Sequence, residues 1–222
     1  MHVRVRSLDV ALRACLWLRS GIRVLARLWE GDLDLEQGTH PGDAVYACAR
    51  EAADWPALLP STESATLRVS GAVHDCGPLV SSQLLAARIR DAACDAVRDR
   101  TGHRPPPPGD ALPDLPLHAV ANRGRLTIYR DLCGRSLHRR GYRQAMHRAS
   151  LNEAAAAGCL VLAGWPEMAA ADPEALLLDP MCGSGTFLVR ATASAHYCPE
   201  SWCCCCCPTL LLAGCLRRSR AP

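Results

Sequence analysis

The residues best suited to chemistry lie in a glycine-rich stretch from Leu176 to Ala191. An apolar run with strand character ends in the acid Asp179, and Gly183 and Gly185 then predict a tight turn that leads into a helix from Phe187. A strand, a glycine turn and a helix N-terminus place backbone N–H groups beside a bound molecule, and small residues let it come close. The pattern predicts a ligand site, with a plain glycine-packed turn as the alternative.

This motif does not match the common phosphate-binding fingerprints. It contains no G-x-x-x-x-G-K-[ST] sequence, and its G-x-G lacks the third glycine of the dinucleotide-binding form. The eight residues from Asp179 to Thr186 instead resemble the first motif of S-adenosylmethionine-dependent methyltransferases. The resemblance implies a site for S-adenosylmethionine lined by Asp179, Pro180, Met181, Cys182, Gly183, Ser184, Gly185 and Thr186.

A second chemical feature is a basic segment between Gly134 and Arg148, which holds five arginines and two histidines but no acid. Arginines contact phosphates without reading the base sequence, and an aromatic ring among them can stack on single-stranded RNA. The segment predicts an RNA contact, with an exposed basic linker between domains as the alternative. The candidate RNA-binding residues here are Arg135, His138, Arg139, Arg140, Tyr142 and Arg143.

The clearest predicted helix runs from Ser81 to Val97. A serine stands at its start, its apolar residues recur every three to four positions, and Gly102 ends it. Arg88 and Arg90 add two candidate RNA contacts on this helix, with a solvated helix face as the alternative.

The other segments complete an α+β order. Apolar periodicity and turn residues predict a helix over 10–22, a strand over 22–28, a helix over 42–50, a strand over 66–70 and a hairpin of 115–120 with 126–132. A capping box from Ser150 to Glu153 predicts a helix from Ala154 to Gly164, and a strand over 175–178 leads to the glycine-rich motif. The arginine-rich first 27 residues could instead form an organelle transit peptide, but we prefer the folded helix and strand.

Composition bounds the class of protein. The 222 residues suffice for one to two domains of roughly 150 residues, and 49% hydrophobic residues can form a core. All 25 basic residues are arginine, which indicates a GC-rich coding sequence, and the net charge of +3 says little about partners. No apolar run approaches the roughly 18 residues of a membrane span, and no signal peptide is visible. We expect an intracellular protein of the cytoplasm or of an organelle, plastid and mitochondrion included.

The fourteen cysteines divide into two equal groups. Seven are spread over the first 197 residues, where we interpret them as reduced small hydrophobes, and seven crowd between Cys198 and Cys215. Structural zinc ligands come in spaced pairs, and the five consecutive thiols of Cys203–Cys207 cannot converge on one tetrahedral centre. We expect no metal site, and we interpret the tail as translated intron, frame-shifted or alternatively spliced sequence.

Taken in order, these segments resemble the THUMP-domain-containing large-subunit ribosomal RNA guanine-N2 methyltransferases. The blocks that carry the resemblance are 11–25, 82–83 with 88–92, 131–143, 151–153, 164–165 and 178–186, of which 131–143 is the most specific. The resemblance implies an α+β ferredoxin-like and THUMP RNA-binding region followed by the beginning of an α/β Rossmann-like methyltransferase domain.

The implied domains are a ferredoxin-like remnant (1–60), a THUMP-like module (61–133), a basic linker (134–150), the start of the methyltransferase domain (151–195) and a cysteine-rich tail that we expect to be disordered (196–222). The implied reaction moves a methyl group from S-adenosylmethionine to a guanine amine of large-subunit ribosomal RNA, without a metal or a membrane. The family's Asn/Asp-Pro-Pro-aromatic signature does not occur, so we expect a truncated form with little or no catalysis and no assigned catalytic residue. The alternatives are a non-catalytic RNA-binding protein and a non-functional translation product.

Overall fold

The computed structural model describes residues 7–35, 40–60, 64–139, 141, 150–172, 174–195 and 215–216. The chain divides into two compact units: unit 1 comprises residues 1–12 and 23–134, and unit 2 comprises residues 13–22 and 135–222. The first helix, α1 (Leu8–Trp17), contributes residues to both units and contains no fully buried side chain. The boundary that we expected between residues 60 and 61 falls inside unit 1.

Unit 1 is built on a four-stranded mixed sheet in the order β1-β4-β3-β2. Its strands are β1 (Leu25–Asp32), β2 (Leu67–His74), β3 (Leu115–Asn122) and β4 (Arg125–Asp131). β2 and β3 are parallel, whereas β4 is antiparallel to both β3 and β1. The predicted hairpin is confirmed: β3 and β4 join through Arg123 and Gly124, both with positive φ (50° and 76°), as a type I′ turn requires.

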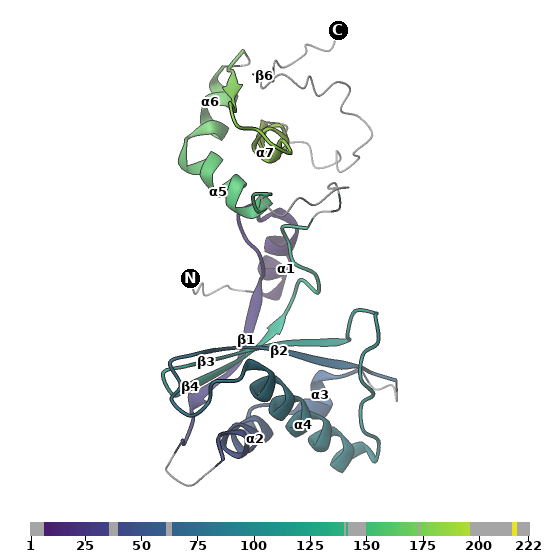
Figure 1. Cartoon of the computed structure of the whole chain (residues 1–222). Coiled ribbons are helices and arrows are strands. Elements are labelled where there is room, and N and C mark those ends of the chain that lie inside the picture. Colours follow the sequence, from purple (N-terminus) through teal and green to yellow (C-terminus); the bar gives the residue numbers. More distant parts are fainter. Residues whose placement is uncertain are drawn as a thin grey trace. The chain divides into compact units, whose positions relative to one another are not determined.

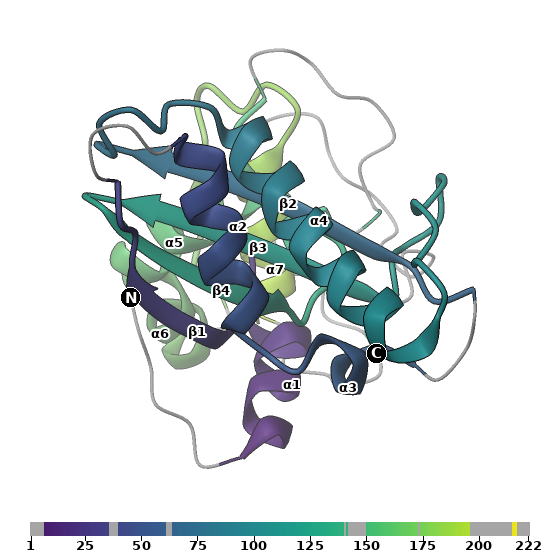
Figure 2. The same cartoon turned by 90° about the horizontal axis from the view of Figure 1, so that it is seen from below.

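The helices α2 (Pro41–Glu51) and α4 (Ser82–Thr101) lie side by side on one face of this sheet (Figures 1 and 2). Alternate residues of β3 are buried toward them, since side chains of a strand point to opposite faces in turn. Both predicted caps of α4 are confirmed. The Ser81 hydroxyl accepts a hydrogen bond from the Leu84 N–H at 3.2 Å, and Gly102 ends the helix with a φ of 79°.

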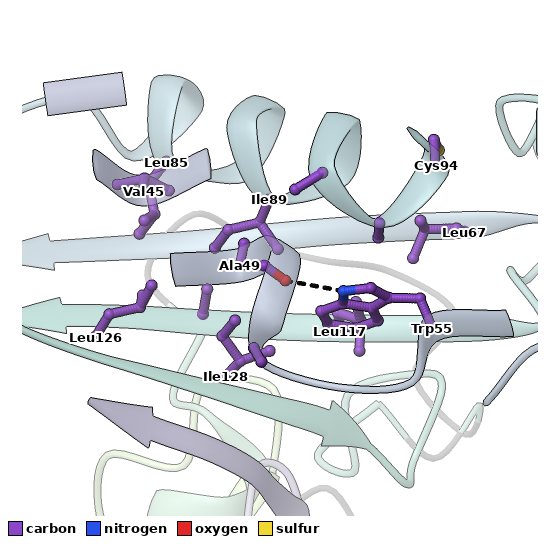
Figure 3. Packing of buried hydrophobic residues seen from close by; sticks show 14 of the residues in the cluster. Val45, Ala49, Trp55, Leu67, Leu85, Ile89, Cys94, Leu117, Leu126 and Ile128 are labelled. Carbon is purple, nitrogen blue, oxygen red and sulfur yellow. Dashed lines mark hydrogen bonds between the residues drawn. The ribbon is translucent and has the colours of Figure 1, made fainter. Parts of the chain in front are cut away.

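A short third helix, α3 (Trp55–Leu58), closes the core of unit 1. Trp55 is fully buried, and its indole N–H donates a hydrogen bond to the Ala49 carbonyl at 2.8 Å (Figure 3). The polar atom of this large aromatic side chain is therefore satisfied inside the core. Trp55 belongs to a core cluster that also includes Val45 of α2, Leu85 and Ile89 of α4, and the strand residues Leu67, Leu117, Leu126 and Ile128.

The opposite face of the sheet is polar. Ser70 on β2 and His118 on β3 are direct partners in register, and the Ser70 hydroxyl lies 2.9 Å from His118 Nδ1. Burial, together with the nearby positive charge of Arg23, lowers the pKa of His118, although Asp131 opposes this shift. The imidazole is therefore neutral at pH 7.

We expect acid to destabilise unit 1 through His118. Because its pKa is lowered in the folded state, the unfolded chain binds a proton that the folded chain resists, so stability declines as the pH falls below about 6.5 and through the folded pKa. Urea unfolding between pH 7.5 and 5, about the range over which histidine titrates, should show this decline in the native chain and a smaller one in His118→Gln. Exposed His103, replaced by Gln, is the control. Parallel pH profiles of the native chain and His118→Gln would contradict the prediction.

Unit 2 contains the helices α5 (Glu153–Leu162), α6 (Trp165–Ala171) and α7 (Thr186–Ala195) and the two-residue strands β5 (Leu177–Leu178) and β6 (Cys215–Leu216), which pair antiparallel. A small core joins the helices, and it is formed by Leu160, Trp165, Ala169 and Ala191 with Ala175, Leu177 and Phe187 against it. The Trp165 indole N–H donates to the Ala191 carbonyl at 3.3 Å, which holds α7 against α6.

One of two sequence predictions for α5 was wrong. The N-cap of α5 is Asn152 and not Ser150: its side-chain oxygen accepts from the Ala154 N–H at 2.8 Å and the Ala155 N–H at 3.4 Å. The predicted end of this helix is confirmed, because α5 stops at Leu162, two residues before Gly164. That glycine adopts a φ of 72°, and a new helix starts directly after it with a proline in its first turn, where no backbone donor is needed.

Several boundaries also moved. α1 ends at Trp17 rather than at residue 22, and β1 runs from Leu25 to Asp32 rather than over 22–28, because its pairing with β4 decides its extent.

Among the described residues no single helix is long and apolar enough to cross a membrane, and only the bent pair of α5 and α6 meets that test by length and composition. Within the same residues no cluster of His, Cys, Asp or Glu could hold a metal ion. The cysteine-rich tail lies outside the described residues except for Cys215–Leu216.

Candidate functional site

The predicted strand, turn and helix around Asp179 are all present in unit 2. β5 ends at Leu178, Asp179 follows it, and α7 begins at Thr186. One carboxylate oxygen of Asp179 accepts a hydrogen bond from the Met181 N–H at 3.1 Å, which starts the turn. The acid is thus fixed at the carboxyl end of the strand, where α/β sheets bind their ligands.

The two glycines of the turn are required by the backbone conformation. Gly183 has a φ of 50° and Gly185 a φ of 71°, a region that other residues enter only at a cost. A Cβ atom added at Gly185 would meet no atom of the described residues within 4 Å, although the glycine itself is buried. The Gly185 N–H donates to the Cys182 carbonyl at 2.7 Å and closes the turn.

The side chains around the turn divide into an anchored and an exposed group. Thr186 and Leu188 at the start of α7 are buried, and the Thr186 hydroxyl lies 3.3 Å from that of Ser184. Ser184 and Met181 are exposed, Met181 to 91%. A rigid helix start therefore carries a loop with a carboxylate, a hydroxyl and backbone groups that a ligand can reach. These donors and acceptors suit a small molecule that carries positive charge and amino-acid groups, as S-adenosylmethionine does.

The predicted RNA-binding residues lie in both units. In unit 2, Arg135 and Arg139 are exposed, and the Arg139 N–H donates to the Ser136 carbonyl at 3.1 Å in a tight turn. The Ser136 hydroxyl lies 2.8 Å from His138 Nδ1 and fixes that ring in the same turn. The predicted residues Arg140, Tyr142 and Arg143 lie outside the described residues.

In unit 1, the arginines of α4 have acidic neighbours. Arg88 lies 3.4 Å from the Asp43 carboxylate, and Arg90 lies 3.7 Å from that of Asp91. Further along the helix, Arg100 pairs with Asp54 at 2.8 Å. Such exposed pairs contribute little to stability, but each carboxylate offsets positive charge that a phosphate would otherwise meet.

Sequence reasoning missed one pair of aromatic side chains. His118 on β3 and Tyr129 on β4 are direct partners in register on the polar face of the unit 1 sheet. The signal was present in the sequence: once the hairpin turn at Arg123–Gly124 is recognised, the two-residue period of strands places both rings on the same face.

Three comparisons with known proteins bear on this site. A model of the RMKL-like methyltransferase domain matches residues 140–212. The ribosomal RNA large subunit methyltransferase K/L of Saccharophagus degradans is 38% identical over 190 residues, which cover 86% of this chain and 24% of that protein. The chain is therefore similar to this methyltransferase family. It spans about a quarter of the length of the curated relatives that it matches.

Solved structures with a related fold agree. A protein from Listeria monocytogenes, named a predicted N6-adenine-specific DNA methylase, has a TM-score of 0.65 and 26% identity over 85% of this chain and 45% of its own. SMU.472, solved in complex with SAH, has a TM-score of 0.66 and 22% identity over 85% of this chain and 46% of its own, and shows the fold alone. The methyltransferase fold that the resemblance implied is thus supported by both comparisons.

Proposed function

We propose that this chain is part of an S-adenosylmethionine-dependent methyltransferase that modifies the N2 of a guanine in large-subunit ribosomal RNA. The observation that carries the proposal is the turn from Asp179 to Thr186, with its two positive-φ glycines, in a chain similar to the K/L methyltransferases. We further propose that unit 1 is a THUMP-like RNA-docking module and that unit 2 starts a Rossmann-like domain. The relatives are bacterial, which favours the cytoplasm over an organelle.

Within this proposal, S-adenosylmethionine supplies an activated methyl group on its sulfonium centre. The Asp179 carboxylate provides a negative charge that is already oriented by its bond to the Met181 N–H, so binding a cationic ligand costs little reorganisation. Gly183 and Gly185 allow that ligand to approach the backbone, and the buried start of α7 keeps the turn in place. The residues described hold and orient the cofactor; we assign none of them to the attack by the guanine amine.

Equilibrium dialysis with radiolabelled S-adenosylmethionine tests the proposal. We expect Asp179→Asn to weaken binding about tenfold or more, because a bond to a charged group contributes about 1.5–3 kcal/mol. The amide oxygen can still accept from the Met181 N–H, so the turn is kept and only the charge is lost. Asp172→Asn is the matched control, since Asp172 makes the same kind of turn bond to the Glu174 N–H at 2.9 Å.

The outcomes separate clearly. Loss of binding in Asp179→Asn but not in Asp172→Asn supports the site. Equal affinity of both variants, or no measurable binding of the cofactor by the native chain, would rule it out.

A second candidate function, RNA binding without catalysis, is supported by the exposed Arg135 and Arg139 of the basic segment. It differs in one measurable respect: RNA binding would persist while the cofactor fails to bind. The same dialysis, run beside an RNA-binding assay, distinguishes the two functions.

A further inference from the structure

The polar face of the unit 1 sheet carries an ordered row of side chains across all four strands. Ser70 on β2 pairs in register with His118 on β3, His118 with Tyr129 on β4, and Tyr129 with Arg27 on β1. The helices α2 and α4 cover the other face, where the neighbouring strand residues Leu117 and Ile128 are buried (Figures 1 and 2). The two rings of the row are therefore neighbours at the centre of the sheet, on the face that α2 and α4 leave uncovered.

Hydrogen bonds fix one ring of this row. The Ser70 hydroxyl contacts both the Leu117 carbonyl, at 3.2 Å, and His118 Nδ1, at 2.9 Å, so the imidazole is held from one edge. The lowered pKa of His118 keeps the ring neutral at pH 7. A neutral ring offers a π surface to a nucleic-acid base, as the aromatic residues of sheet-based RNA readers do.

One arginine at the rim of this face is available to an anionic partner. Arg68, two residues before Ser70 on the same face, is exposed and donates to the neutral Gly109 carbonyl at 2.8 Å, a contact that does not offset its charge. Arg27 is also exposed, and it shares the carboxylate of Glu30 with Arg125. Arg27 and the α4 arginines Arg88 and Arg100 each have a carboxylate partner, whereas the contact of Arg68 is to a neutral group. The polar side chains at the centre of this face suit nucleic-acid bases better than they suit a protein partner, which would bind through apolar side chains.

We propose that the face centred on His118 and Tyr129 is a stacking platform for unpaired bases of the RNA substrate. The inference rests on the proposed function, because it names the form of RNA that unit 1 contacts. Arg68 would contact a backbone phosphate of a single strand, while the two rings would stack on successive bases. A base-paired duplex presents no free base faces and would gain nothing from the rings.

The test uses the full chain and the fluorescence anisotropy of a short labelled single-stranded RNA and of the matching duplex. Tyr129→Leu keeps an apolar side chain but loses the ring, and we expect it to bind the single strand about tenfold more weakly. Tyr129→Phe keeps the ring and should stay within about twofold of the native chain. Arg139→Ala, in the basic segment of unit 2, should reduce the salt dependence of binding, whereas Tyr129→Leu should leave it unchanged.

The outcomes of this test are distinguishable. An unchanged affinity of Tyr129→Leu, with weaker binding by Arg139→Ala, would overturn the platform and leave RNA as the substrate. Equal losses for single strand and duplex would also overturn it, because stacking needs free bases. No RNA binding by the native chain would remove both the platform and the RNA part of the proposed function. Far-ultraviolet circular dichroism confirms that each variant is folded, and His118→Gln repeats the test from the neighbouring strand.

Discussion

Replacing Trp55 with alanine should lower the free energy of unfolding of unit 1 by about 3–5 kcal/mol. The side chain is fully buried between the helices and the sheet, so its removal leaves a cavity that close-packed neighbours fill only in part (Figure 3). The change also removes the donor to the Ala49 carbonyl, which is then buried with one partner fewer. A loss of this size is a large share of the roughly 5–15 kcal/mol that typically stabilise a domain.

Urea unfolding followed by circular dichroism measures the effect. Trp55→Phe separates its two causes, since the phenyl ring fills most of the space but cannot donate to the Ala49 carbonyl; we expect a loss between those of the native chain and the alanine variant. Trp17→Ala is the surface control, because that ring is 51% exposed and its removal should cost less than about 1 kcal/mol. If Trp55→Ala and Trp17→Ala unfold at the same urea concentration, the core assignment is wrong.

Local residue chemistry predicted the elements that are stabilised locally. α4 carries its own start and stop signals in Ser81 and Gly102, and the β3–β4 hairpin carries its turn in Arg123 and Gly124. The turn after Asp179 is likewise determined by its glycines and by an acid that bonds two residues ahead. For these elements the residues that determine the start, the end or the turn are neighbours in sequence. A single sequence is therefore sufficient to predict them.

The remaining elements depend on distant partners. β1 pairs with β4, so that Leu25 faces Asp131 across a long stretch of intervening chain, and no local pattern specifies that register. α3 has four residues, too few for a periodic signal, and exists because Trp55 is drawn into the core. Ser150 and Asn152 both have cap chemistry, and only the path of the chain decides between them.

The candidate RNA contacts show the same limit for charge. The sequence identifies arginines but not the carboxylates that face them. Two predicted RNA contacts on α4 show this: Arg88 lies 3.4 Å from the Asp43 carboxylate, and Arg90 lies 3.7 Å from that of Asp91. The arginines of the basic segment stand in sequence without acids, so their charge could be inferred directly. The His118 and Tyr129 pair is the converse case, since two residues without any motif become a surface only through the sheet register.

Gly185→Val should weaken cofactor binding, while it costs the fold no more stability than a matched glycine replacement elsewhere in unit 2. Gly185 has a φ of 71°, where an L side chain costs about 1–2 kcal/mol and a β-branched one more. Valine should therefore shift the turn toward a different backbone conformation, in which the backbone groups no longer face the ligand. The added side chain would also occupy space in which the described residues place no atom within 4 Å. Both effects act on the proposed ligand, and we expect S-adenosylmethionine affinity to fall at least about tenfold.

Gly164→Val is a closely matched control for this prediction. Gly164 has a φ of 72°, a Cβ atom added there would also meet nothing within 4 Å, and it lies in the same unit between α5 and α6 rather than in the turn. The two variants should therefore lose similar stability in urea unfolding, while only Gly185→Val loses the cofactor in equilibrium dialysis. Equal cofactor affinity in the two variants would mean that the turn after Asp179 is a plain structural turn, and the family motif would then have no binding role in this chain.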